Sequence, residues 1–461
     1  MNDQRVAFVL AGGGFKGAFE LGALQHLILE VGIVPDVITA TSAGGVLGTV
    51  VAQGRDVDAC GVRLGEAEAD LMAMTRTDVV FGEQPWLREL DGTSVADHIH
   101  RLVRQHGRPE LDDDWDELEA EALAVIGTDA PEEASAPRAA AGARRNPFEQ
   151  IASTTRALVD GQRAARGLPR AALNLDPFEA SIRGRRDVGI ATVDPALVAR
   201  PGMDLRLAVT ALKAKETHYV TEAGHLVGSD ARSPIPGADG IDVIDGVIAS
   251  ASVPGVFPPR SLGKDHYVDG GCLQNIPLQA AVDLGATAIY TLVAVPVRPA
   301  KKTLSLWAAE SLGYMSTQVE NLAIDLPSGC TNTVIEPTIE VVASFEVHPG
   351  LMRIDMHYGR MRAEECLAGM DDGLDPIVKM ASDTLTTMRL MAWRFEHRCI
   401  ESGRVDGEQL ERLRQLKCCV RSALDARSAL GLPAPDGSDE WGQTWELHAT
   451  PLPDGFPSDL T

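Results

Sequence analysis

The sequence predicts an α/β protein with a mainly parallel central sheet. Two buried-strand patterns, Val6–Leu10 and Val37–Ala40, are each followed by small residues and then by a helical pattern. A strand–helix–strand–helix order implies parallel strands joined by right-handed crossovers. The chain has 461 residues, 44% of them hydrophobic, which is enough for a sizeable core and predicts a folded protein.

The elements can be placed in order from their periodicity. Apolar residues at helical spacing predict a first helix from Lys16 to Glu30, with Gly32 as its stop signal, and a second helix from Ser42 to about Ala52. Later segments share strand-like patterns: Leu205–Leu212 with a hairpin to His218–Thr221, Ile241–Ile244, Thr287–Val295, and Thr333–Val342. The rest of the chain after Thr303 has mostly helical patterns.

Changes in composition suggest the domain organisation. We expect a catalytic domain over residues 1–300, interrupted by an insertion at about 61–173 whose Ala/Pro-rich part, about 128–146, is mobile. Residues 301–432 are expected to form a mostly helical C-terminal region. Residues 433–461 are rich in Pro, Gly and Asp and are expected to form a loose tail.

Charge and cysteine content exclude several classes. With 42 Lys+Arg against 66 Asp+Glu, the net charge is −24, which disfavours nucleic-acid binding and electrostatic capture on anionic membranes. The seven cysteines form no CxxC pair and no dense framework, which favours a reducing compartment. The short apolar run from Val6 to Ala11 does not fit the pattern of a secretory leader, and no apolar run approaches the roughly 20 residues that span a bilayer. We expect a soluble, cytoplasmic protein.

A glycine-rich loop, Gly12-Gly13-Gly14-Phe15-Lys16-Gly17, connects the first strand to the first helix. It matches GxGxxG, which in a dinucleotide-binding fold cradles a pyrophosphate. That interpretation also needs an acidic residue after the next strand, but Thr41-Ser42 stand there and Asp36 precedes the strand. The loop could equally hold an oxyanion with its N–H groups, or serve as a tight turn.

A second motif, Ala40-Thr41-Ser42-Ala43-Gly44, lies between a strand and a helix. This is the pattern of a nucleophile elbow, in which the serine occupies a sharp turn above the sheet. Ala40 stands where the usual elbow has glycine. The alternative is a serine that only caps the helix.

A third motif, Val268-Asp269-Gly270-Gly271, could hold a carboxylate after a short strand or form an Asp-Gly hairpin turn. A fourth segment, from Ala249 to Pro259, has small residues ended by Pro254 and followed by Phe257-Pro258-Pro259. Taken alone, each of these two segments is weak evidence for an active site.

In this order, the four motifs resemble the patatin-like phospholipase family over Val6 to about Val295. The resemblance implies a three-layer α/β/α patatin-like fold and a catalytic dyad, with Ser42 as nucleophile and Asp269 as base. It assigns Gly12, Gly13, Gly14, Lys16 and Gly17 to the oxyanion hole. Supporting positions in the elbow and the Asp turn are Ala40, Ala43, Gly44, Gly270 and Gly271. Lys16 departs from the family's more frequent arginine.

The resemblance implies a hydrolase of phospholipids, lysophospholipids or related lipid esters. An acyltransferase using the same acyl-enzyme stays open, as do a dinucleotide-binding protein and a non-catalytic scaffold. We interpret His266 as a packing or surface residue rather than a triad member. We expect a lipid or other acyl-ester substrate, peripheral membrane contact through an apolar lip, and no nucleic-acid partner, metal or organic cofactor. The oligomeric state stays open.

Overall fold

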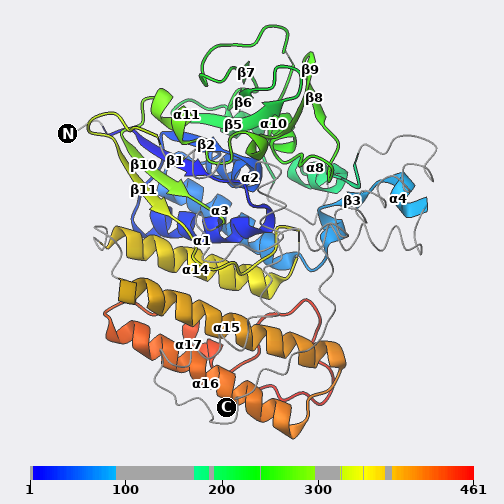
Figure 1. The fold of residues 1–461 in the computed structure, drawn as a ribbon, viewed down its shortest axis with the longest axis vertical. Coiled ribbons are helices and arrows are strands. Elements are labelled where there is room, and N and C mark those ends of the chain that lie inside the picture. The colour runs from blue at the N-terminus through cyan, green and yellow to red at the C-terminus, as the bar shows by residue number, and fades with distance from the viewer. Residues whose placement is uncertain are drawn as a thin grey trace, which may run out of the picture.

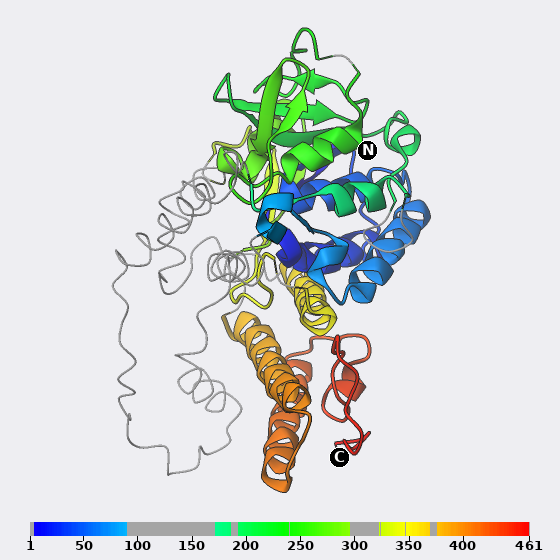
Figure 2. The same ribbon diagram turned by 90° about the vertical axis from the view of Figure 1, so that its right-hand side faces the viewer.

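The computed structural model consists of a sheet with helices on both faces and a stack of further helices below (Figure 1, Figure 2). The predicted mobile segment 128–146 and most of the predicted insertion lie outside the residues that the structure describes. Those residues are 4–89, 171–185, 192–238, 240–295, 322, 324–345, 347–368 and 376–460.

The main sheet contains nine strands within the described residues. Those from β11 to β5 are parallel to one another, and β6 and β7 continue the sheet in antiparallel pairing. Beyond the end of β2, the same edge of β5 pairs antiparallel with β9 (Asp265–Asp269). Strand β9 in turn pairs with β8 (Arg260–Leu262). The order is β11 (Thr331–Ile335), β10 (Ala288–Leu292), β1 (Val6–Leu10), β2 (Val37–Ala40), β5 (Asp204–Ala211), β6 (Thr217–Thr221), β7 (Leu226–Val227).

The two faces of the sheet follow from alternation along each strand. In β1, Phe8 and Leu10 pack on one face, whereas Ala7 and Val9 pack on the other with α11 (Leu278–Asp283). The predicted three-layer arrangement is therefore confirmed. The helices on the first face are α1 (Gly17–Gln25), α2 (Ser42–Val51), α3 (Val57–Ala73), α10 (Val243–Ser250) and α14 (Pro349–Leu367).

Close backbone contact joins α1 to α14. A Cβ at Gly22 would lie 1.8 Å from the carbonyl oxygen of Met356, and one at Gly359 would lie 1.9 Å from that of Phe19. Only glycine permits such an approach. Both β11 and α14 come after residue 300, yet they complete the sheet and its helical layer (Figure 1).

Below α14 lie α15 (Pro376–Ser402) and α16 (Gly407–Ala429), in agreement with the predicted helical C-terminal region (Figure 1). The tail that we expected to be loose is instead packed on these helices. It contains α17 (Ser438–Trp441), and both Trp441 and Leu460 are buried. Composition misled here because a few large side chains anchor an otherwise Pro- and Gly-rich segment.

Ile241–Ile244 does not form the predicted strand. Asp242 caps α10, and its side chain accepts a hydrogen bond from the N–H of Asp245 while the Asp245 side chain returns the contact. This capping box overrides the short apolar run. The remaining short elements are β3 (Gly82–Glu83), β4 (Leu173–Asn174), α4 (Pro85–Glu89), α8 (Asp176–Ile182) and α9 (Pro195–Val198). Across the described ranges, we find no helix that is both long and apolar enough to span a bilayer.

Candidate active site

Ser42 is the first residue of α2, directly after the turn that ends β2. Its φ of 52° lies in the left-handed region, which costs a residue with a side chain about 1–3 kcal/mol. Its N–H donates to the Oγ of Ser250 at 2.9 Å. The residue is 7% exposed at the positive end of the α2 dipole. This is the geometry of a nucleophile elbow.

Small residues let the elbow approach β1. The N–H of Gly44 donates to the carbonyl oxygen of Ala11 at 3.2 Å, and a Cβ at Gly44 would lie 2.5 Å from that oxygen. Ala40 is fully buried, and its methyl carbon lies 3.3 Å from where Gly48 would carry a Cβ. Glycine at position 48 therefore makes room for the alanine that departs from the usual elbow.

The pairing of β5 brings Asp269 to the elbow. On β5, Leu207 pairs with Ala40 of β2, and Val209 pairs with Asp269 of β9. Since β6 occupies the opposite edge of β5, β2 and β9 meet end to end on one edge. Two residues along a strand span about 6.6 Å, so Asp269 and the turn at Ser42 are neighbours.

Asp269 is fully buried, and its Oδ1 accepts the N–H of Gly271 at 2.7 Å. A one-turn helix, Gly270–Cys272, follows, so the Asp-Gly hairpin alternative is wrong. A Cβ at Gly270 would lie 2.3 Å from the carbonyl oxygen of Ala208. Burial first, and then the charge of Asp269, raises the pKa of the Cys272 thiol to about 12, so this neighbouring sulfur stays protonated at neutral pH.

The segment after Asp269 also contacts the other two motifs. The Oγ1 of Thr41 donates to the carbonyl oxygen of Gln274 at 2.8 Å. The N–H of Gly12 donates to the carbonyl oxygen of Asn275 at 3.3 Å, and the Asn275 side chain returns a bond of 3.3 Å to the carbonyl oxygen of Gly12. The Asp turn, the elbow and the glycine loop thus form one connected structure.

The glycine loop contributes amides whose hydrogen-bonding capacity is unused. Gly14 has a φ of 63°, and a Cβ there would lie 2.2 Å from the carbonyl oxygen of Ser344. Within the described residues, the N–H groups of Gly13, Gly14 and Ala43 have no acceptor. These three residues line the same pocket as Ser42. The sequence did not single out the Ala43 amide, although the residue after an elbow serine is a known donor position.

Other predicted loop residues have different partners. The N–H of Gly12 is bonded to Asn275, whereas Gly17 lines the pocket with its N–H directed back to the carbonyl oxygens of Gly14 and Phe15. The buried Lys16 ammonium pairs with Glu340 at 2.9 Å. The lysine charge therefore lies on the α14 side of the loop and not in the pocket.

Two buried carboxyls lie behind the loop. The Oε1 of Glu20 accepts the N–H of Ala11 at 2.8 Å. Burial raises the pKa of Glu20 well above its usual value, more than the Ala11 bond lowers it. Burial likewise raises the pKa of Asp355, against the charge of Lys16. Burial thus favours the neutral form of both carboxyls more than it would be favoured in water.

The pocket beside Ser42 has a volume of about 170 Å³ and a largely apolar lining. Leu21, Val50, Leu71 and other aliphatic side chains from α1, α2 and α3 form one part of it. Five phenylalanines from separate segments line another part: Phe15, Phe81, Phe178, Phe257 and Phe345. The ring centroid of Phe81 lies 5.3–5.8 Å from those of Phe15, Phe257 and Phe345.

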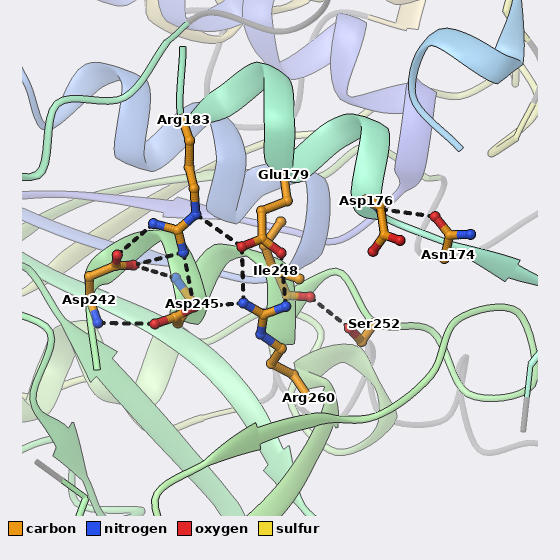
Figure 3. Close-up of polar contacts among 9 residues, drawn as sticks. All are labelled: Asn174, Asp176, Glu179, Arg183, Asp242, Asp245, Ile248, Ser252 and Arg260. Carbon is orange, nitrogen blue, oxygen red and sulfur yellow. Dashed lines mark hydrogen bonds and ion pairs between the residues drawn. The ribbon is translucent and has the colours of Figure 1, made fainter. Parts of the chain in front are cut away.

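An ionic cluster holds α10 beside the site (Figure 3). Arg183 bonds Glu179, Asp242 and Asp245, and Arg260 bonds Glu179 and Asp245. Burial opposes the charge of Glu179, but hydrogen bonds from Arg260 and Arg183 outweigh it and lower the pKa of Glu179. The cluster joins α8, α10 and β8, and no periodic pattern of residues predicts it.

Residues considered as alternatives lie elsewhere. His266 is exposed, and its Nδ1 contacts the Oγ of Ser261 at 2.9 Å. Across the described ranges, no group of three or more His, Cys, Asp or Glu side chains is arranged to hold a metal ion. Two further segments that could suggest metal ligands, the acidic run at 112–117 and the pair His98 and His100, lack partners at metal-ligand spacing and lie outside the described residues.

A parallel α/β sheet with an elbow serine and a glycine loop at one end defines the class of protein. The family model described as patatin-like phospholipase matches residues 8–282, more than half of the chain. The chain belongs to the patatin-like phospholipase family, and its fold is the patatin fold.

Individual relatives are distant. Patatin-like phospholipase domain-containing protein 7 of Rattus norvegicus is 29% identical over 117 residues, which cover 25% of this chain and 8% of that protein. The chain thus spans a small fraction of this relative. VipD from Legionella pneumophila has a TM-score of 0.34 at 15% identity, over 95% of this chain and 86% of VipD. The type III effector ExoU has a TM-score of 0.26 at 14% identity, over 95% and 71%.

Proposed function

We propose that the protein is a serine acyl hydrolase that cleaves lipid esters, with Ser42 as nucleophile and Asp269 as base. The observation that carries the proposal is the position of Ser42 on the wall of an apolar pocket that the amides of Gly13 and Gly14 also line. An ester with an apolar acyl chain matches that combination, because its carbonyl needs donors and its chain needs an apolar surface.

In the first half of the reaction, Asp269 accepts the hydroxyl proton as the Oγ of Ser42 attacks the ester carbonyl carbon. The resulting oxyanion receives hydrogen bonds from the amides of Gly13, Gly14 and Ala43. The tetrahedral intermediate then collapses. The carbon–oxygen bond to the leaving alcohol breaks, and the alcohol takes the proton from Asp269, which leaves an acyl-enzyme on Ser42.

In the second half, Asp269 removes a proton from a water molecule that attacks the acyl carbonyl. Ser42 leaves with that proton, and a carboxylic acid is released. A carboxylate is a weak base for serine or water, so the mechanism depends on close geometry and on the amide donors. Burial of Asp269 and the positive end of α2 support this requirement.

The proposed substrates are phospholipids, lysophospholipids or related lipid esters whose acyl chain enters the apolar pocket. The net charge of −24 argues that any membrane contact is peripheral and apolar rather than electrostatic. Raising the anionic lipid fraction of vesicles should therefore leave binding unimproved in a flotation assay. A clear gain in binding would contradict this contact.

A lipid panel assayed with the wild type beside Ser42→Ala tests the proposal. We expect the wild type to release fatty acid and to be labelled by a fluorophosphonate probe, and Ser42→Ala to do neither. Turnover retained by Ser42→Ala, with its product confirmed by mass spectrometry, would overturn the assignment. Transfer of the acyl group to an added alcohol in preference to water would identify an acyltransferase.

A further inference from the structure

We propose that Ser250, the last residue of α10, is a positioning residue that fixes the backbone of the nucleophile. This inference rests on the proposed function of Ser42. Ser250 is fully buried, its Oγ accepts the N–H of Ser42 at 2.9 Å, and its hydroxyl donates to the carbonyl oxygen of Ala208 at 2.7 Å. No other hydroxyl within the described residues contacts the Ser42 amide.

The Ser42 amide needs this acceptor. It belongs to the first residue of a helix, where the N–H groups have no intrahelical partner. Its backbone also has the unfavourable φ of 52°, and such a conformation persists only where the surroundings hold it. A hydrogen bond from a buried hydroxyl to the amide supplies that restraint directly at the strained residue.

The second bond of Ser250 sets the direction of the first. Because the hydroxyl proton is directed to Ala208, a lone pair of Oγ is left to face the Ser42 amide. Ala208 precedes Val209, which pairs with Asp269. The chain of bonds from Ser42 through Ser250 therefore ends on the strand segment that also positions Asp269.

The position of α10 is itself fixed at its other end. The ionic cluster of Arg183 and Arg260 with three carboxylates anchors the first turn of this helix (Figure 3). Because both ends of α10 are anchored, the helix is a rigid support. The Ser250 hydroxyl can therefore hold the Ser42 amide in place and does not move with it.

Ser252 offers a comparison within the same segment. It is 1% exposed, and its hydroxyl donates to the carbonyl oxygen of Ile248 at 2.7 Å (Figure 3). Its backbone carbonyl accepts the N–H of Asp269 at 2.9 Å, a contact that alanine preserves. Ser250→Ala and Ser252→Ala thus remove the same atom from adjacent buried sites, but only the first removes the acceptor of the nucleophile amide.

A third variant, Thr49→Val, removes a buried hydroxyl from the helix that carries Ser42. The Oγ1 of Thr49 donates to the carbonyl oxygen of Gly45 at 2.7 Å, and Thr49 is outside the pocket lining. Its kcat should match that of the wild type.

The experiment measures kcat, KM, fluorophosphonate labelling rate and Tm for the full chain. For Ser250→Ala we expect kcat and the labelling rate to fall about tenfold with KM within about twofold, the pattern of a lost transition-state interaction. Ser252→Ala should lose a similar amount of Tm but a smaller part of kcat. Should Ser250→Ala fail to fold, Ser250→Cys leaves no cavity, places a weaker acceptor at the Ser42 amide, and should show a reduced kcat at unchanged KM.

Equal kcat losses in Ser250→Ala and Ser252→Ala, in a wild type that is active and loses activity on Ser42→Ala, would overturn this inference alone. A loss confined to KM would do the same. A wild type that neither turns over any ester nor labels would overturn the proposed function as well.

Discussion

The site at the carboxyl ends of β1 and β2 and the core of the C-terminal helices use buried polar groups in opposite ways. Ser42 and Asp269 are held through amides and a hydroxyl, and the nearby amides of Gly13 and Gly14 have no acceptor within the described residues. Among the C-terminal helices and the tail packed on them, buried charges are paired with one another: Arg389 with Glu446, Lys417 with Glu396, and Arg427 with Glu365.

The helical pairs are part of a wider set of contacts. Glu446 also receives a bond from Arg353 at 2.8 Å, and Arg389 lies 3.4 Å from the ring centroid of Trp441. Burial opposes the charge of Glu446, but Arg389 and the other nearby cations outweigh it and hold the pKa of Glu446 far below its usual value. Through Glu446, the tail is therefore attached to Arg353 of α14 and Arg389 of α15.

This difference between the two regions indicates which buried polar groups can take part in a reaction. A buried ion pair whose charges neutralise each other away from solvent presents no free charge to a substrate, so it acts on stability. A strained serine beside unused amides retains that capacity, so it can act on rate. Substitutions in the first region should therefore change kcat, and those in the second should change the free energy of unfolding.

The largest effect should come from Asp269→Asn. The amide keeps the size of the side chain and can still accept the Gly271 N–H, but it cannot take up a proton. We expect kcat to fall about 10³-fold or more, with Tm within a few degrees of the wild type. Asp265→Asn, on the same strand, should retain activity. A kcat for Asp269→Asn near that of the wild type would remove the base from the mechanism.

Glu446→Gln should affect stability instead. It leaves Arg389 buried without a full counter-charge, which should lower the free energy of unfolding by about 3–5 kcal/mol in a urea titration. Exposed Glu440→Gln should change it by less than about 0.5 kcal/mol. At temperatures where the variant is folded, its kcat should equal that of the wild type; a large drop there would break the separation of the two regions.

The same variant has a defined pH signature. Because the folded pKa of Glu446 is depressed, its contribution is complete above the unfolded value of 4.5 and is lost as pH falls below it. The difference in unfolding free energy between wild type and Glu446→Gln should therefore shrink between pH 7 and pH 3. A difference that stays constant would mean that the ionised carboxylate is not what holds the tail.

A smaller effect is expected from Phe81→Ala, which opens one wall of the pocket. The kcat/KM for long-chain p-nitrophenyl esters should rise relative to that for short-chain esters, and the ratio of the two values should change about tenfold. Phe395→Ala, on α15 and outside the pocket, serves as the control. An unchanged chain-length profile would place the acyl chain elsewhere.

The smallest effect should be that of Glu20→Gln. The folded pKa of Glu20 is raised, so its contribution to stability is complete below the unfolded value of 4.5 and declines as pH rises toward the folded value. The glutamine keeps an acceptor for the Ala11 N–H without this decline. We expect the wild type to lose about 1 kcal/mol or more relative to Glu20→Gln between pH 5 and pH 9. Parallel pH curves for the two proteins would show that Glu20 does not titrate in this way.

The parts of the site that the sequence predicted are those defined by local backbone chemistry. The elbow at Ser42 and the turn after Asp269 need small residues at fixed positions relative to the serine and the aspartate. Such spacings can be recognised in the amino-acid sequence itself. The fold class followed from two strand patterns with glycine turns. Even the missed capping box at Asp242 and Asp245 had a readable three-residue spacing.

The parts that escaped prediction depend on contacts between distant segments. Phe81 and Phe345 share the pocket wall, but nothing in their flanking residues connects them. Lys16 pairs with Glu340, and Arg389 pairs with Glu446. No repeating pattern in the sequence connects the two members of either pair. Only the assembled sheet and helices decide which of many charged residues meet.

The contact between α1 and α14 determines when the apolar surface of α1 can be buried during protein synthesis. The helix after the glycine loop, Gly17–Gln25, is synthesised well before the helix that covers it, Pro349–Leu367. Until that later segment leaves the ribosome, Phe19 and its neighbours have no cover, so the nascent chain must keep an apolar surface from aggregating in the interval between the two.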